Sequence, residues 1–378
     1  MSGRPPPYSY ASRTRGARMF HLDYNEYWGR IHPDLARGFE VENLTRQYAM
    51  SSPRPLLDLL GEVTGWSGAA PCWATHGADE ALLHSLLAAR LNETSARQTL
   101  ARPGGQIAER SGALSWATSW APSYEHASTF AAQLGLQMLK DFREAEIVYH
   151  CTPNNPTGDF TGESISVPDF EAQLASSGTP KWLVLDLTYE DYMPTAAREA
   201  QAAWVAERLC SHRPTLAVKS FAKCLPIAGF RLGLIATNIP LVQEHFERVY
   251  NRKLVTEAAL YVLQHGLDHR AFYAVERQSI FDVRQELHRG LSALAWSYGV
   301  QLQVPPGGNF ILGHANELQL SAFHKALMQV GISTRLKASE DGRCLLRITS
   351  VGESYLPEIF QRVREAREAE STPPVLIY

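Results

Sequence analysis

Short apolar runs alternate with longer amphipathic segments along most of this chain. Runs rich in Val, Ile and Leu at 146–150, 182–186 and 215–219 each lead straight into a polar loop. Such runs are typical of buried strands, and the segments between them have the spacing of helices that cover a sheet. The alternation predicts an α/β fold with a mostly parallel sheet.

Two stretches carry a clear helical pattern. Between Asp79 and Arg90 four leucines fall on one helical face, and acidic residues occupy the first turn, where the helix dipole favours them. We therefore expect a helix that begins just after Gly77. Residues 256–297 contain few helix breakers and are expected to be mostly helical, bridging two domains.

The length of 378 residues favours two domains over one. We expect an N-terminal arm with part of a small domain at 1–40 and a large domain at 41–255. An interdomain helix and a C-terminal small α/β domain are expected at 256–378. Because ligands of open α/β sheets bind beyond the carboxyl ends of the strands, the loops after the predicted strands should hold the functional residues.

Composition narrows the function classes. The chain is 45% hydrophobic with a formal net charge of -3, and its 36 basic residues are dispersed, so a globular protein that does not bind nucleic acid is expected. No apolar run approaches the roughly 18 residues of a membrane span. The five cysteines show no C-x-x-C pair, which favours a reducing cytoplasm. The Pro- and Arg-containing first eighteen residues lack the apolar region of a signal peptide and are expected to form a flexible arm.

The strongest chemical signal is Ser220-Phe-Ala-Lys223, followed by Ala228-Gly-Phe-Arg231-Leu-Gly233. Here a lysine follows an apolar strand, and glycines flank an arginine where the backbone can pass close to a ligand. A partly desolvated lysine can attack an aldehyde, while an arginine and a hydroxyl can grip a phosphate. The combination indicates a phosphorylated aldehyde cofactor.

Two further segments follow predicted strands. Asp186 ends an apolar run, three residues before Tyr189, and a buried acid there can pair with the ring nitrogen of pyridoxal 5'-phosphate (PLP). The loop 152–158, Thr-Pro-Asn-Asn-Pro-Thr-Gly, is a rigid turn at the expected ligand edge. Taken singly, an aspartate or such a turn is more often structural.

In this order the motifs resemble the class I/II aminotransferases, which are PLP enzymes of fold type I, and in particular the histidinol-phosphate aminotransferase branch. The resemblance spans roughly residues 20 to 365 and rests on Asn25-Glu26, Tyr48, Gly77-Ala78-Asp79-Glu80, Pro122-Ser123-Tyr124, Asn155-Pro156-Thr157-Gly158, Asp186 with Tyr189, Ser220 to Gly233, and Leu346-Arg347-Ile348. It implies a large domain with a mostly parallel seven-stranded sheet covered by helices, and a smaller α/β C-terminal domain.

The resemblance also implies roles at the cofactor. Lys223 would carry PLP as a Schiff base and move a proton from the substrate α-carbon. Asp186 would pair with the ring nitrogen, Tyr189 and Asn155 would hydrogen-bond the phenolic oxygen, and Tyr124 would stack on the ring.

The phosphate would lie against Ser220, Arg231 and the backbone N–H groups at Gly77-Ala78-Asp79, because a helix N-terminus is an anion site. Tyr48 resembles the tyrosine that reaches the phosphate from a neighbouring subunit. This implies a homodimer with shared active sites.

On the substrate side, Arg347 matches the arginine that grips the α-carboxylate, with a structural salt bridge as the alternative. Asn25 and Tyr27 are counted with it, and Arg335 is a candidate for a distal substrate group. The residues after Asp186, the residue after Glu26 and the stretch 253–263 all depart from the family pattern. These departures favour a specialised amino acid over histidinol phosphate as the substrate.

The leading hypothesis is therefore an amino-acid aminotransferase, with natural-product metabolism as a candidate setting. A PLP-dependent cyclase, eliminase or decarboxylase acting on a modified amino acid such as a hydroxylated arginine is the alternative, because cofactor motifs do not distinguish these reactions. A non-catalytic regulator is disfavoured by the presence of Lys223, and the G-x-G-x-x-G motif of a nicotinamide enzyme is absent. His265 and His269 have H-x-x-x-H spacing without the glutamate of H-E-x-x-H, so no metal site is expected there.

Overall fold

The computed structural model describes residues 19–37, 64–66, 68–92, 113–176, 181–250, 255–338 and 344–371. The chain divides into two compact units. The first comprises the segment that ends at Asn25, Val283–Val304 and the segment that begins at Phe310; the second comprises Glu26–Asp282 and Pro305–Asn309. The boundary between the two units falls inside the predicted helical stretch 256–297, because residues up to Asp282 belong to the second unit and those from Val283 belong to the first. The domain ranges given above stay a prediction.

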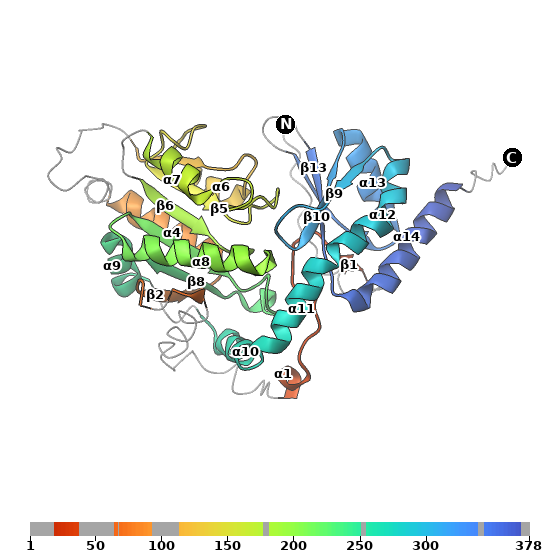
Figure 1. Cartoon of the computed structure of the whole chain (residues 1–378), viewed down its shortest axis with the longest axis horizontal. Coiled ribbons are helices and arrows are strands. Elements are labelled where there is room, and N and C mark those ends of the chain that lie inside the picture. Colours follow the sequence, from red (N-terminus) through yellow and green to blue (C-terminus); the bar gives the residue numbers. More distant parts are fainter. Residues whose placement is uncertain are drawn as a thin grey trace. The chain divides into compact units, whose positions relative to one another are not determined.

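The second unit contains the large sheet (Figure 1). Its seven strands have the order β2-β8-β7-β6-β5-β3-β4, and β8 alone runs antiparallel to its neighbours. This matches the predicted mostly parallel sheet. The strands are β2 (Cys72–Thr75), β3 (Ser115–Thr118), β4 (Gln137–Met138), β5 (Ile147–Cys151), β6 (Trp182–Asp186), β7 (Thr215–Ser220) and β8 (Gly233–Thr237).

Helices cover both faces of this sheet, and the alternation of side chains along each strand explains how. In β6, Leu183 and Leu185 belong to one buried cluster while Trp182 and Val184 belong to another. A strand that is buried on both faces has a nearly continuous run of apolar residues, and this is why the sequence pattern predicted β6 clearly. The first cluster includes side chains from α7 (Val167–Ala175), α8 (Thr195–Cys210) and α10 (Glu257–Asp268), and the second from α4 (Ala78–Leu91), α6 (Glu125–Gln133) and α9 (Pro240–Arg248).

The predicted elements agree with those observed. The β6 bounds are as predicted, β5 is shifted by one residue at both ends, β7 is one residue longer, and α4 begins directly after Gly77. The stretch from 256 to 297 is helical but interrupted. It forms α10, α11 (Arg270–Asp282) and α12 (Arg284–Ser297), of which α12 belongs to the first unit. The second unit also contains α1 (Pro33–Arg37) and the short 3-10 helices η2 (Glu190–Tyr192) and η3 (Ala228–Phe230).

The first unit is built on a four-stranded antiparallel sheet of order β12-β13-β10-β9. Its strands are β9 (Gln301–Gln303), β10 (Phe310–His314), β12 (Arg335–Ala338) and β13 (Cys344–Thr349), and its other helices are α13 (Glu317–Gln329), η5 (Glu353–Tyr355) and α14 (Leu356–Ser371). A two-stranded parallel sheet pairs β1 (Phe20–His21) with β11 (Ile332–Ser333). Asn316 caps α13 with a complete capping box, which fixes where that helix begins.

None of the helices within the described ranges combines the length and the apolar character that crossing a bilayer requires.

Candidate active site

The carboxyl ends of β5, β6 and β7 bring the predicted cofactor residues to one edge of the large sheet. Cys151 pairs with Asp186 across β5 and β6, and Asp186 pairs with Val218 across β6 and β7. The loop after β5 holds Asn155, and the loop after β7 holds Lys223. These candidate residues thus lie at the strand ends and in the loops where ligands of open α/β sheets bind, and their roles stay predictions.

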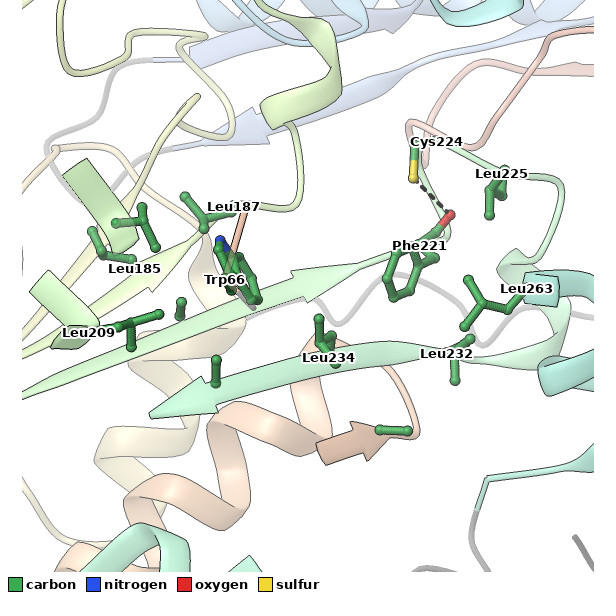
Figure 2. Close-up of a cluster of buried hydrophobic side chains, with 14 of the residues drawn as sticks. Trp66, Leu185, Leu187, Leu209, Phe221, Cys224, Leu225, Leu232, Leu234 and Leu263 are labelled. Atoms are coloured by element: carbon green, nitrogen blue, oxygen red, sulfur yellow. Dashed lines mark hydrogen bonds between the residues drawn. The ribbon is translucent and has the colours of Figure 1, made fainter. Parts of the chain in front are cut away.

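The loop that carries Lys223 is anchored on both sides by buried residues. Phe221, Cys224 and Leu225 belong to the hydrophobic cluster drawn in Figure 2, in which the thiol of Cys224 donates to the carbonyl oxygen of Phe221 at 3.6 Å. The hydroxyl of Tyr192 donates to the carbonyl oxygen of Lys223 at 2.6 Å. Lys223 itself is only half-buried. A fixed backbone with an accessible amine suits a covalent attachment point.

Asp186 is buried, with 4% of its surface exposed, and both carboxylate oxygens accept hydrogen bonds. The hydroxyl of Tyr149 donates to Oδ2 at 2.6 Å, and the backbone N–H of Thr188 donates to Oδ1 at 3.0 Å. Burial raises the pKa of Asp186 above that of an ordinary carboxyl group, and the bonds from Thr188 and Tyr149 oppose this shift. A buried carboxylate held in this way can form a charge-assisted hydrogen bond with a positively charged N–H group.

Tyr124, Tyr189 and Asn155 are the predicted ring contacts. The hydroxyl of Tyr124 donates to Oδ1 of Asp79 at 2.8 Å. Burial raises the pKa of Tyr124, with a further contribution from Asp79 and smaller ones from Tyr189 and Asp186, so Tyr124 stays a protonated donor near both residues. Asn155 and Tyr189 are buried, with 5% and 3% exposed. The structure therefore brings Tyr124, Tyr189 and Asp186 together.

The N-terminus of α4 forms a cradle with β8. Gly77 is the N-cap residue of α4 and has φ +91°. Because glycine has no side chain, it does not cap the first N–H groups of the helix. A Cβ atom on Gly233 would lie 2.8 Å from the nitrogen of Ala78, and one on Gly77 would lie 2.8 Å from Nη2 of Arg231. The glycines of the sequence motif thus permit a close approach between the helix start, β8 and an arginine.

The other side chains of this cradle are donors. Ser220 pairs with Gly233 across β7 and β8, and Gly233 approaches the start of α4. Arg231 adopts the left-handed conformation with φ +55°, and its Nη2 lies 3.5 Å from Oδ2 of Asp79. A hydroxyl, a guanidinium and the first N–H groups of a helix make a donor set that fits a phosphate, and Asp186 fits a ring N–H. The residues present therefore fit PLP.

Sequence reasoning missed several residues that support this site. Lys219 is buried, its amine donates to Glu190 and, at 2.7 Å, to Asp191, and Nε of Arg277 lies 3.3 Å from Asp191. Burial alone would lower the pKa of Lys219, but the two carboxylates raise it well above its ordinary value. This cluster ties η2 to β7, the strand that leads to Lys223.

Thr188 is a second missed residue, since the sequence analysis treated it only as a departure from the family. Besides its bond to Asp186, its hydroxyl accepts the backbone N–H of Ser220 at 3.2 Å. It therefore links the two strand ends that carry Asp186 and Lys223. Its place beside a buried carboxylate was the available signal, because Thr and Ser commonly hydrogen-bond local backbone groups.

Three of the predicted substrate residues lie in the first unit. Arg347 is buried, and its Nη2 donates to the carbonyl oxygen of Asp23 at 2.8 Å. Thr349, two residues on, accepts the N–H of Asn25 at 3.0 Å, and Asn25 has φ +53°. Arg335 is directly opposite Arg347 in the β12–β13 register. The structure thus brings Asn25, Arg335 and Arg347 together.

The fourth predicted substrate residue, Tyr27, and the predicted phosphate contact Tyr48 are not part of that group. Tyr27 belongs to the second unit, where its hydroxyl donates to the carbonyl oxygen of Arg30 at 3.0 Å and its ring meets Tyr273 edge-on at 6.1 Å. A substrate role for Tyr27 stays a prediction. Tyr48 lies outside the described residues.

Comparisons with known proteins agree with this geometry. The family described as aminotransferase class I and II matches residues 124–354. A histidinol-phosphate aminotransferase of Dechloromonas aromatica is 26% identical over 51% of this chain and 49% of its own length. A threonine-phosphate decarboxylase of Pseudomonas aeruginosa is 26% identical over 57% of this chain and 60% of its own. The chain spans about half the length of the curated relatives it matches first.

A solved structure supports the fold. The histidinol-phosphate aminotransferase of Sinorhizobium meliloti in complex with pyridoxal-5'-phosphate has a TM-score of 0.72 and 19% identity, covering 97% of this chain and 96% of that one. The fold is that of the fold type I PLP-dependent transferases. The family match covers more than half of the sequence, and the chain belongs to the aminotransferase class I and II family, which depends on PLP.

Proposed function

We propose that this chain is an aminotransferase that acts on an α-amino acid in specialised metabolism, with Lys223 as the residue that holds the cofactor. The observation that carries the proposal is the convergence of Lys223, Asp186, Ser220 and the start of α4 at one edge of the large sheet. When bound, PLP supplies an electron sink for the substrate's α-carbon. Asp186 would keep the ring nitrogen protonated, and Nζ of Lys223 would accept the α-proton.

The arginine pair supports a proposal for the substrate. Arg335 and Arg347 are directly opposite each other in the β12–β13 register, and two guanidinium groups on one face of a sheet are a donor set for an anionic ligand. We infer that Arg347 grips the α-carboxylate and that Arg335 receives an anionic group on the substrate side chain. This disfavours a cationic substrate such as a hydroxylated arginine. Both relatives named above act on phosphorylated compounds, as their names state.

Borohydride reduction followed by peptide mapping tests the attachment. We expect pyridoxyl on Lys223 and none on Lys219, a buried lysine four residues earlier that serves as an internal control. Lys223→Ala should remove the covalent linkage and the yellow colour. Modification of another lysine in the wild-type protein would overturn the proposal.

A single-turnover experiment tests the reaction type. A panel of amino acids including histidinol phosphate, threonine phosphate, acidic amino acids and hydroxylated arginines is mixed with the enzyme without a keto acid. A transaminase yields one equivalent of keto product and then stops until an acceptor is added. Continued turnover with release of carbon dioxide would instead support a decarboxylase, which the similarity to the Pseudomonas aeruginosa enzyme makes the second candidate.

We also propose that the active unit is a homodimer in which Tyr48 reaches the partner's cofactor phosphate, as the family resemblance implies. Mixing Tyr48→Phe and Lys223→Ala chains tests this. A shared site predicts mixed dimers with one doubly altered and one intact site, and so an activity above both parents. No recovery in verified mixed dimers would refute sharing.

A further inference from the structure

Three histidines from two distant parts of the sequence lie together in the second unit. His265 and His269 sit at the C-terminal end of α10, one turn apart, and His32 directly precedes α1. The ring centroid of His269 is 3.8 Å from that of His32 and 4.3 Å from that of His265. One nitrogen from each residue can be chosen such that all three atoms lie within 4.8 Å of one another.

His265 provides an independent observation. Its side chain is buried, with 8% exposed, and its Nε2 has no hydrogen-bond partner among the residues that the structure describes. A buried polar atom without a partner costs free energy, and native proteins seldom leave one without a reason. An atom that binds this nitrogen would remove the cost.

A carboxylate lies beside this histidine cluster. Imidazole nitrogens are common metal ligands, and a neighbouring carboxylate often orients them. An oxygen of Asp34 lies 3.9 Å from Nδ1 of His32 and can complete or orient the ligand set.

The geometry points to a divalent transition-metal site formed by His32, His265 and His269, with zinc as the best-suited ion. Three histidines are an established zinc ligand set, at Zn–N distances of about 2.0–2.1 Å, with a fourth position for water or a carboxylate. Nitrogens at those distances lie about 3.3 Å apart in a tetrahedral site, so ion binding requires the rings of His32 and His269 to rotate out of their stacked arrangement.

Such an ion would fasten the segment that precedes α1 to the end of α10. The same segment already has one attachment, because Arg30 forms an ion pair with Glu276 of α11 at 2.6 Å. From the sequence no metal site was expected at His265 and His269, because the glutamate of H-E-x-x-H is missing and the spacing shows only these two histidines. The third ligand precedes them by more than two hundred residues.

Zinc titration tests the proposal with a readout other than activity. Full-length protein without a histidine tag is freed of metal with a chelator and titrated with zinc chloride by calorimetry, and cobalt(II) replaces zinc for visible absorption. We expect one tight equivalent, a higher thermal unfolding midpoint with zinc, and cobalt bands of high intensity typical of four-coordinate sites.

Single variants identify the ligands. Each ligand is replaced in turn, in the variants His265→Gln, His32→Gln and His269→Gln. Changes of residues around a metal's ligands weaken binding by roughly 10- to 100-fold, and we expect the loss of a ligand to weaken zinc binding by more than that. His84→Gln is the matched control, since His84 and His245 form a separate histidine pair with nitrogens 2.9 Å apart. If His265→Gln does not fold, the zinc affinities of the His32→Gln and His269→Gln variants decide, because these two side chains are only half-buried. Absence of tight binding, or loss of binding in His84→Gln only, would overturn the site.

Discussion

The carboxyl edge of the large sheet and the arginine pair of the small sheet hold charge in different ways. At the large sheet, the buried Asp186 accepts hydrogen bonds from the hydroxyl of Tyr149 in β5 and from the backbone of Thr188. At the small sheet, the half-buried Arg335 is opposite the buried Arg347, which has the same charge. The first arrangement sets hydrogen-bond donors around an acid, while the second sets two cations opposite each other.

We expect this difference to separate chemistry from specificity. A prearranged set of partners around Asp186 suits a cofactor that stays bound, because the protein is organised for its charge in advance. Two guanidinium groups on one face suit an anionic ligand that binds and leaves, because each can donate charge-assisted hydrogen bonds to it. Four substitutions test whether the two regions divide the work in this way.

The largest effect is expected from Asp186→Asn. Truncating one partner of a buried charge pair costs about 2–5 kcal/mol, or roughly 30- to several-thousand-fold in affinity for the protonated cofactor. Cofactor affinity is measured by equilibrium titration of the apo-protein with PLP. An unchanged affinity would mean that Asp186 does not pair with the ring nitrogen.

The same variant has an opposite effect on the apo-protein. Because the pKa of Asp186 is raised on folding, its contribution to stability is full below the ordinary pKa of aspartate and is lost as pH rises through the folded-state value. Asparagine has no such loss. The apo form of Asp186→Asn should therefore be at least as stable as the wild type at neutral pH, as urea denaturation would measure.

Arg347→Lys is expected to have the next largest effect. Lysine cannot reproduce the planar fork of arginine, so the substrate's α-carboxylate should lose one charge-assisted hydrogen bond. The loss is about 1.5–3 kcal/mol, which corresponds to a decrease in kcat/KM of roughly 10- to 150-fold for every amino acid. Arg335→Lys is the control, and it should affect only substrates with a distal anion. Equal losses in both variants across all substrates would remove the distinction between the two arginines.

Gly77→Ala should have a moderate effect at the phosphate cradle. A non-glycine residue in the left-handed region costs about 1–2 kcal/mol, and the added methyl group would meet Arg231. Gly68→Ala is matched, because Gly68 has φ +74° and open space around it. Both variants should lose similar stability, but only Gly77→Ala should also bind PLP more weakly. Weaker PLP binding in both variants would mean that backbone strain alone causes the loss of affinity.

The smallest effect is expected from Tyr149→Phe. Removing a hydrogen bond to the ionised carboxylate raises the pKa of Asp186 further, so the acidic limb of the pH–activity profile should move to higher pH while activity at alkaline pH is kept. Tyr192→Phe serves as the comparison, because the Tyr192 hydroxyl bonds the carbonyl of Lys223 instead. Only Tyr149→Phe should move the limb.

Sequence reasoning predicted the large sheet well because buried strands such as 182–186 carry their own signal in consecutive apolar residues. Lys223 and Asp186 were singled out because Asp186 ends such a strand and Lys223 lies in the loop after another, and their roles stay predictions. Contacts between distant segments could not be read from periodicity. The partner of Asp186 is Tyr149, 37 residues away, and the register that places Arg335 opposite Arg347 depends on a pairing that the pattern does not specify.

The close packing of α10 against the lysine loop has a consequence for engineering. A Cβ atom on Gly266 would lie 2.8 Å from Leu225, which stands two residues after Lys223 and is labelled in Figure 2. The position of the reactive amine is therefore partly set by a helix that contributes none of the predicted cofactor residues. A mutational library directed at α10 should contain variants with altered turnover and unchanged cofactor contacts, so searches confined to the residues around the cofactor would overlook them.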